Sequence, residues 1–166
     1  FYNVENLFDT KDDSLKNDNE FLPSSKKKWT SSKWNIKTNN IVKIIAANNF
    51  PEIIGLCEVE NSDVLKKITS HYLLRTKNYS IIHFDSPDRR GIDCALLYQS
   101  NKLDLLSMKP NEVNLNGRKT RDILSATFTH LDDTFSIYVN HWPSRYGGRK
   151  KSNSKREIAA KTLLKL

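Results

Sequence analysis

Cysteine is scarce in this chain of 166 residues, which has two, Cys57 and Cys94. Two cysteines at this separation give neither a disulfide framework nor a thiolate metal site, and they leave the cellular compartment open. Both lie in apolar runs typical of strands, so we expect them to be small buried hydrophobic side chains. No apolar run approaches the roughly 20 residues needed to span a bilayer. No internal repeat or low-complexity linker is present either.

The composition is that of a folded domain. Hydrophobic residues make up 37% of the chain and charged residues 28%, which excludes an intrinsically disordered segment. The length suits one domain with a real core, and we expect it to span residues 1–166. Because the sequence starts at Phe1, within an apolar stretch, we expect any targeting segment to lie upstream of it.

Positive charge is concentrated at one end of the chain. The formal net charge is +8, and residues 145–166 contain eight Lys/Arg and one acid, Glu157. The preceding 144 residues contain 19 bases and 18 acids, so they are nearly neutral. Such a patch suits a polyanion, namely nucleic acid, an anionic lipid headgroup or a phosphorylated small molecule. The alternative is an ordinary lysine-rich surface in contact with water.

Three stretches have the apolar spacing of helices. The first is capped by Thr30 or Ser31, the second opens at Ser62 and Asp63, and the third is capped by Ser154. Their apolar sides are expected to comprise, in turn, Trp34, Ile41, Ile44 and Ile45; Val64, Leu65, Ile68 and Tyr72; and Ile158, Ala159, Thr162, Leu163 and Leu166.

Strands are expected between and after these helices. The strand-like stretches are residues 1–8, 53–57, 79–84, 93–98, 103–108, 123–129 and 135–140, and residues 9–28 form a long surface loop. This order predicts a mixed α/β or α+β layered domain with helices packed on a sheet. Because the last helix has no strand after it to cover its apolar side, we expect the chain to stop within the fold.

The strongest functional signal is the junction between an apolar strand and an acidic segment. Ile53–Cys57 is uncharged, which predicts a strand covered on both faces, and Glu58 follows it directly. A carboxylate at the end of such a strand has a rigid support, which suits ligand or metal chemistry. The alternative is that Glu58 merely begins a solvated loop.

A second carboxylate lies near the start of the chain. Asn3 and Glu5 are two residues apart, so they share one face of a strand. An amide and a carboxylate side by side can bind a phosphate oxygen and a hydrated divalent ion. The alternative is an edge strand whose polar face contacts water.

Two arginines precede strands. Arg90 stands in a turn before the strand at residues 93–98, and Arg121 stands just before the strand at residues 123–129. A guanidinium at such a position can pair with a phosphate. Charged turns are common, so an exposed pair with a neighbouring acid is the alternative for each.

A denser cluster follows the last strand. His141 lies at the strand end and is followed by Ser144, Arg145 and the pair Gly147-Gly148. These side chains can contact phosphoryl oxygens together, and the glycines allow close backbone approach to a ligand. A lone histidine in this position would more often be structural, but the cluster favours a functional interpretation.

Taken together, these motifs resemble the endonuclease/exonuclease/phosphatase superfamily, whose fold is similar to that of pancreatic deoxyribonuclease. The matching stretches appear in the family's order and span nearly the whole chain. They are Tyr2-Asn3-Val4-Glu5-Asn6-Leu7-Phe8-Asp9, Ile53-Ile54-Gly55-Leu56-Cys57-Glu58-Val59-Glu60-Asn61, Arg90-Gly91-Ile92-Asp93-Cys94-Ala95-Leu96-Leu97-Tyr98, Thr120-Arg121-Asp122 and Asn140-His141-Trp142-Pro143-Ser144-Arg145.

The resemblance implies a two-layer mixed β-sandwich flanked by helices, with one active site at an end of the sheets. It implies that Glu58 is the principal Mg²⁺ ligand, with Mn²⁺ or Ca²⁺ as substitutes for Mg²⁺. The other implied roles are the active-site asparagine for Asn3, an acidic metal neighbour for Glu5, phosphate-side groups for Arg121 and His141, and residues lining the approach for Ser144 and Arg145.

The chain departs from the family at its C-terminal end. The Gly-Asp-Phe-Asn and Ser-Asp-His segments of the family do not occur in it. Phosphodiester hydrolysis needs an attacking water, a group to remove its proton, a cation and help for the leaving group. We therefore expect the domain to be truncated, and this chain alone to be inactive while the intact protein is active.

Three functions remain open from the sequence. The first is a Mg²⁺-dependent phosphoric ester hydrolase, a nuclease whose basic region at residues 145–166 holds a nucleic-acid backbone. The second is the same chemistry on an inositol, sphingolipid or other small phosphoester. The third is a non-catalytic domain that binds a polyanion. No transmembrane segment and no protein partner is implied.

Overall fold

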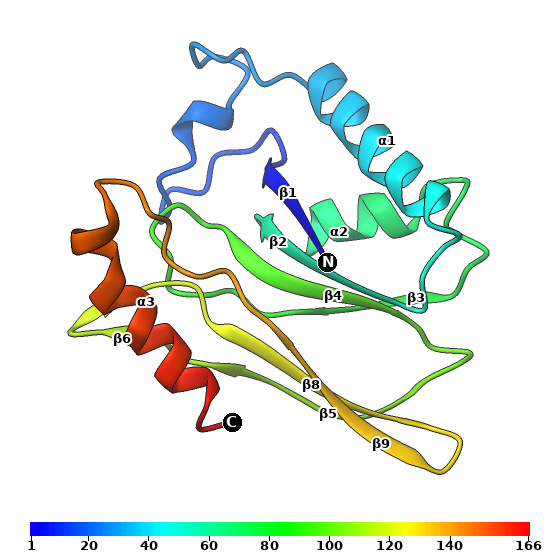
Figure 1. Cartoon of the computed structure of the whole chain (residues 1–166). Helices are drawn as coiled ribbons and strands as arrows, with labels where there is room; N and C mark the ends of the chain where they lie inside the picture. The colour runs from blue at the N-terminus through cyan, green and yellow to red at the C-terminus, as the bar shows by residue number, and fades with distance from the viewer.

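Two sheets form the frame of the molecule, the first from residues 2–99 and the second from residues 104–139. A computed structural model describes all of residues 1–166 (Figure 1). The first sheet has the order β1-β2-β4-β3. Its strands are β1 (Tyr2–Leu7), β2 (Ile53–Val59), β4 (Asp93–Gln99) and β3 (Tyr79–His83). β1 and β2 run parallel, whereas β2–β4 and β4–β3 are antiparallel pairs.

The second sheet is antiparallel and has the order β5-β8-β9. Its strands are β5 (Asp104–Asn111), β8 (Ile123–His130) and β9 (Asp133–Val139). Between β5 and β8 the chain forms a small hairpin of β6 (Asn114–Leu115) and β7 (Arg118–Lys119).

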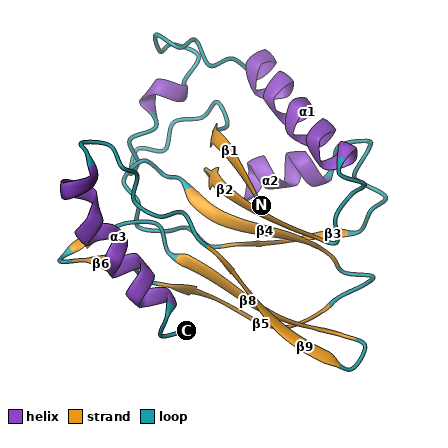
Figure 2. Cartoon of the chain, in the orientation of Figure 1, coloured by secondary structure: helices purple, strands orange, loops and turns teal.

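Three α-helices flank the sheets (Figure 2). They are α1 (Ser31–Ala47), α2 (Ser62–Thr69) and α3 (Arg149–Leu163), and a short 3₁₀ helix, η1 (Asn19–Phe21), lies in the loop after β1. α1 and α2 lie beside the first sheet, and α3 lies beside the second (Figure 2). No helix is both long and apolar enough to cross a membrane.

The alternation of side chains along the central strands divides the core in two. In β4, Ala95 and Leu97 pack under α1 and α2, whereas Cys94 and Leu96 pack between the two sheets. β2 is divided in the same way, with Leu56 in the first core and Cys57 in the second. The uncharged run before Glu58 is therefore covered on both faces, and the predicted mixed α+β sandwich with flanking helices is confirmed.

Some local predictions are wrong. α3 begins at Arg149 and not at Ser154, because Gly148 takes a positive φ of 94° that ends the preceding turn and starts the helix earlier. Ile44, Tyr72 and Leu166, expected on apolar helix sides, are 41%, 68% and 42% exposed. Tyr72 and Leu166 lie beyond the ends of their helices, because α2 ends at Thr69 and α3 at Leu163. The β6–β7 hairpin was not predicted, although Asn-Gly is the strongest short signal for such a turn.

Candidate active site at the ends of β1 and β2

Irregular backbone marks the ends of β1 and β2. The pairing of the two strands shifts between Asn3 and Leu7, and the pairing of β2 with β4 shifts between Cys57 and Val59. Glu5 and Glu58 have φ values of 54° and 65°, in the left-handed region that side-chain-bearing residues rarely adopt. Bulges of this kind redirect side chains next to functional sites.

These bulges bring together three of the predicted residues. Asn3 donates from Nδ2 to Glu58 Oε1 over 3.1 Å, and His141 Nε2 lies 3.2 Å from the same oxygen. The Glu58 and His141 side chains are 16% and 17% exposed, so the cluster is shielded but open to solvent. Residues from the start, middle and end of the chain thus meet at one carboxylate.

His141 is held in its neutral form. Burial lowers the pKa of His141 to about 4, and the positive charge of Arg121 acts in the same direction, with Glu58 opposing it. A neutral imidazole next to a carboxylate donates from Nε2, which leaves Nδ1 unprotonated. Nδ1 is buried and has no hydrogen-bond partner, so the ring is oriented by its contact with Glu58.

Glu5 lies at the rim of the cluster with Lys37 of α1. The Glu5 N–H donates to Asn3 Oδ1 over 2.8 Å, and Lys37 Nζ donates to the Glu5 carbonyl over 2.6 Å. Burial lowers the pKa of Lys37, while Glu5 and Glu58 both act to raise it. Lys37 therefore lies near both carboxylates. No sequence motif pointed to Lys37, which is one of many lysines in the chain.

Arg121 supports the His141 segment from below the surface. Its NH1 group donates to Asp88 Oδ2 over 3.0 Å, and NH2 donates to the His141 carbonyl over 3.1 Å. The Arg121 side chain is 8% exposed, and the paired Asp88 is 9% exposed. Its positive charge also lowers the pKa of His141, and a direct phosphate contact by Arg121 stays a prediction. Asp88 was not selected from the sequence, although it directly precedes Arg89 and Arg90.

The remaining predicted residues lie farther out. Arg90 is half-exposed, lies 3.4 Å from Asp88 through its Nε, and lines a pocket of about 500 Å³ with Asn6 and Lys27. Ser144 is exposed and lines a different pocket, of about 490 Å³, together with Arg121. Arg145 is exposed in the same loop. The structure thus brings Asn3, Glu58 and His141 into contact and leaves the other predicted groups around them.

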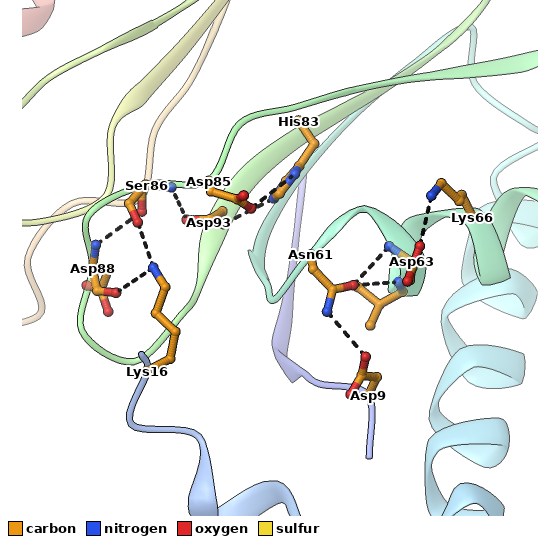
Figure 3. Close-up of polar contacts among 11 residues, drawn as sticks. Asp9, Lys16, Asn61, Asp63, Lys66, His83, Asp85, Ser86, Asp88 and Asp93 are labelled. Carbon is orange, nitrogen blue, oxygen red and sulfur yellow. Dashed lines mark hydrogen bonds and ion pairs between the residues drawn. The ribbon is translucent and has the colours of Figure 1, made fainter. Parts of the chain in front are cut away.

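A separate group of side chains with metal-ligating atoms lies at the end of β3. His83 Nε2 is 3.1 Å from Asp93 Oδ2, and His83 Nδ1 is 3.9 Å from Asp85 Oδ1 (Figure 3). The two nitrogens of the ring face different carboxylates, and one ligand atom from each of the three residues lies within 4.8 Å of the others. Ser86 N–H also donates to Asp93, so the group secures the turn between β3 and β4. Asp93 lies in a stretch that resembles the family, whereas no motif pointed to His83 or Asp85.

The donor atoms around Glu58 fit a hard divalent cation. Glu58, Glu5 and Asn3 offer oxygen ligands, which Mg²⁺ and Ca²⁺ prefer, and no thiolate is among them. Glu58 Oε1 takes both side-chain contacts, so Oε2 has no protein donor. The positive charge that lies near the two carboxylates in this structure comes from Lys37.

Several solved structures share the fold. A humanized D. rerio TDP2 carrying 14 mutations has a TM-score of 0.61 and 12% identity, over 82% of this chain and 51% of that chain. The catalytic domain of human Nocturnin with bound sulfate has a TM-score of 0.60 and 21% identity, over 78% and 51%. An endonuclease/exonuclease/phosphatase from Bacteroides vulgatus has a TM-score of 0.57 and 15% identity, over 80% and 52%.

The chain thus spans about half the length of these structures, and identities this low show the fold alone. No curated protein matches it significantly. The sequence does match a described family, the Endonuclease/Exonuclease/phosphatase family, over residues 1–166. That match covers every part of the Asn3–Glu58–His141 cluster. The chain belongs to the Endonuclease/Exonuclease/phosphatase family.

Proposed function

We propose that the intact protein is a divalent-metal-dependent phosphodiesterase that acts on nucleic acid. The observation that carries this proposal is the convergence of Asn3, Glu58 and His141 within hydrogen-bond distance at the ends of two central strands. Family membership supports phosphoester hydrolysis as the reaction class. The bond that is cleaved and the metal are part of the proposal.

Glu58 and Glu5 would hold the metal, with Mg²⁺ as the first choice for oxygen ligands. When bound, Mg²⁺ stabilises the negative charge that develops on phosphoryl oxygens. Asn3 keeps the Glu58 carboxylate in place through its Nδ2 contact and leaves Glu58 Oε2 free. The strained φ of Glu58 also fixes the carboxylate, because the bulge determines its direction.

His141 supplies an oriented hydrogen-bond donor beside the phosphate position. Because burial keeps the imidazole neutral, the donor is Nε2–H, which lies 3.2 Å from Glu58 Oε1. A bound phosphate would share or take over this donor and would favour protonation of the ring. Arg121 holds the backbone carbonyl of His141, which limits movement of the ring.

A basic surface next to this cluster supports nucleic acid as the substrate. The pocket of about 490 Å³ is lined by Arg118, Lys119, Arg121, Lys151 and Lys155, along with Ser144 and neutral residues. Arg118 and Lys119 also line an adjoining pocket of about 700 Å³ with Arg89. No acid lines either pocket, so both favour a polyanionic backbone.

The first turn of α3 adds positive charge to this basic surface. Arg149, Lys150 and Lys151 lie where the helix dipole is already positive, an arrangement that disfavours the helix and attracts anions. A D. rerio TDP2 structure of the same fold was determined with a single-stranded DNA product. A single strand is therefore the first substrate to test.

The experiment compares the intact protein with Glu58→Gln and with Glu52→Gln, an exposed carboxylate that precedes β2 and pairs with Lys102. We expect Mg²⁺-dependent cleavage of single-stranded DNA or RNA, lowered about 10³-fold by Glu58→Gln and unchanged by Glu52→Gln. The 166-residue chain alone is expected to bind the substrate without turnover.

The same panel includes plasmid DNA, phosphoinositides and sphingomyelin, because the fold does not determine the substrate. Turnover of a lipid phosphoester with no cleavage of any nucleic acid would reject the nucleic-acid assignment and retain the chemistry. Full activity of Glu58→Gln would reject the metal-ligand role.

A further inference from the structure

The imidazole of His83, at the end of β3, is held in a fixed orientation by a buried carboxylate. Asp93 is 1% exposed, and both of its side-chain oxygens have partners. Oδ1 accepts from the Ser86 N–H over 2.9 Å, and Oδ2 lies 3.1 Å from His83 Nε2 (Figure 3). The ring therefore cannot turn without leaving a buried oxygen unpaired, which is costly.

This contact determines which nitrogen of His83 keeps a free lone pair. Because the Asp93 carboxylate accepts, the hydrogen of the neutral ring lies on Nε2 and the lone pair lies on Nδ1. Nδ1 of His83 makes no hydrogen bond, and unlike Nδ1 of His141 it is not completely buried. It is therefore an acceptor within reach of solvent, on the side of the ring that faces Asp85 (Figure 3).

The gap between His83 Nδ1 and Asp85 suits a shared ion better than a hydrogen bond. Asp85 Oδ1 lies 3.9 Å from Nδ1, which is too far for a hydrogen bond, and both atoms are acceptors. Zn²⁺ binds imidazole nitrogen and carboxylate oxygen at about 2.0–2.2 Å, so two ligands of one zinc ion lie roughly 3.3–4 Å apart. The observed separation falls in this range.

The same three residues form the one group in the chain whose ligating atoms all lie within 4.8 Å of one another. In metal sites, a ligating histidine donates its other ring N–H to a carboxylate or a carbonyl, which fixes its tautomer and orientation. Asp93 acts on His83 in this way. A hydrogen-bonded pair of His83 and Asp93 could also serve the fold alone, but that role does not account for a free Nδ1 beside a second carboxylate.

We propose that His83 Nδ1 and Asp85 form a binding site for a divalent transition-metal ion of the zinc class, in which Asp93 positions the imidazole. Mg²⁺ and Ca²⁺ prefer oxygen ligands, whereas Zn²⁺, Co²⁺ and Ni²⁺ accept imidazole nitrogen together with carboxylate oxygen. The Asp85 side chain is 82% exposed, so water would complete the coordination shell and Asp85 is able to adjust to the ion.

The site is distinct from the proposed catalytic metal site, and it lies in a segment that supports the cluster. Asp85 belongs to the connection between β3 and β4. Three residues later Asp88 pairs with Arg121, and Arg121 donates to the His141 carbonyl. An ion that joins Asp85 to His83 would stabilise this connection and, through it, the buried pair of Asp88 and Arg121.

The test uses the 166-residue chain carrying Glu58→Gln, which removes the proposed catalytic metal ligand, so the result does not depend on the proposed function. ZnCl₂ is titrated by calorimetry, and CoCl₂ by visible absorption. We expect one Zn²⁺ site with a Kd of roughly 10⁻⁶–10⁻⁴ M, because two protein ligands provide about half of the binding free energy of a four-ligand zinc site. MgCl₂ should not compete.

NMR of the ring nitrogens identifies the ligand. We expect Zn²⁺ to shift the His83 Nδ1 signal, while the hydrogen stays on Nε2 in its contact with Asp93. A zinc-dependent shift at His141 with none at His83 would overturn the proposal.

Asp85→Asn is then compared with Asp132→Asn, an exposed acid of the turn between β8 and β9 with the same change in charge. Asp85→Asn should lower Zn²⁺ affinity at least about tenfold, while Asp132→Asn leaves it unchanged. Because Asp85 is exposed, its variant is expected to fold, and circular dichroism checks this. His83→Gln, matched by the exposed His130→Gln, should abolish the site.

Equal affinity of the Asp85→Asn and Asp132→Asn variants would overturn the proposal, and so would the absence of saturable Zn²⁺ binding by the parent chain. In either case the contact of His83 with Asp93 serves only to secure the turn between β3 and β4.

Discussion

The ends of β1 and β2 and the helix α3 are built on opposite principles. Around Glu58 the chain is buried on both sides of the strand, and the key side chains contact partners more than 50 residues away in sequence. In α3, Ser152 and Ala159 are the buried residues, and the bases of its first turn are exposed. The first region is a network of contacts between distant parts of the chain. The second is an exposed surface whose charge comes from neighbouring lysines and arginines in the sequence.

Substitutions in the two regions should therefore affect different properties of the protein. Removing packing or a buried contact near β2 should alter stability and the Glu58 cluster together, because the cluster depends on where the strands end. Removing a base from α3 should alter binding of a polyanion and leave the fold intact. The experiments below test this separation.

The largest difference in the free energy of unfolding is expected between substitution of a core leucine and substitution of an exposed one. Leu56 of β2 is fully buried in the first core, two residues before Glu58, whereas Leu164 after α3 is 85% exposed. Leu56→Ala should lower the free energy of unfolding by about 2–5 kcal/mol, and Leu164→Ala should change it by less than about 0.5 kcal/mol. Urea denaturation measures both. Similar losses would show that α3 belongs to the same cooperative core.

The next largest difference in stability is expected between breaking a buried ion pair and breaking an exposed one. Asp88→Asn leaves the buried Arg121 guanidinium without its carboxylate, which should cost about 2–4 kcal/mol. Asp63→Asn removes an acid from an exposed pair with Lys66 and should cost less than about 1 kcal/mol. Chemical denaturation of the two variants makes the comparison. A loss below 1 kcal/mol for Asp88→Asn would mean that Arg121 finds another partner or water.

Periodicity in the sequence predicted most of the strands and helices, and the motifs that resemble the family predicted the residues of the cluster. The uncharged run before Glu58 predicted a central strand, because only such a strand is covered on both faces. The side chains of β4 alternate between the two cores in the same way. Asn3, Glu58 and His141 each follow or occupy such a strand. The resemblance implied that they share one active site, but the contact of Asn3 and His141 with one oxygen of Glu58 depends on two bulges that no local pattern encodes.

Contacts made by tertiary structure escaped the sequence analysis for the same reason. Arg121 is predicted to contact phosphate, and its partners within the protein, Asp88 and the His141 carbonyl, lie 33 and 20 residues away in sequence. Lys37 and His83 became notable only through the carboxylates that the fold placed beside them. α3 begins at Arg149, after Gly148 as its N-cap, because backbone conformation, and not the serine signal, sets its first turn.

A pH titration tests the burial of the cluster. Burial and Arg121 hold the pKa of His141 at about 4, below the 6.5 of a free imidazole. The folded state therefore favours the neutral ring, so the stability it contributes is present above pH 6.5 and is lost as the pH falls toward 4. NMR titration of the His141 ring should show a midpoint near 4. A midpoint at or above 6.5 would show that the ring is solvated or that the Glu58 charge dominates.

The smallest effect on stability is expected from substitutions in the basic pocket, which should change only the binding of nucleic acid. Lys151 and Lys155 line it, and Lys43 and Lys109 are exposed lysines that line neither basic pocket. Replacing the first two with glutamine should reduce the slope of log Kd for single-stranded DNA against log salt by about 1.4, because each lost phosphate contact removes about 0.7. The same replacements at Lys43 and Lys109 change net charge equally and should leave the slope unchanged, with unfolding midpoints constant throughout. An equal loss in both pairs would mean that net charge, and not this pocket, attracts the polyanion.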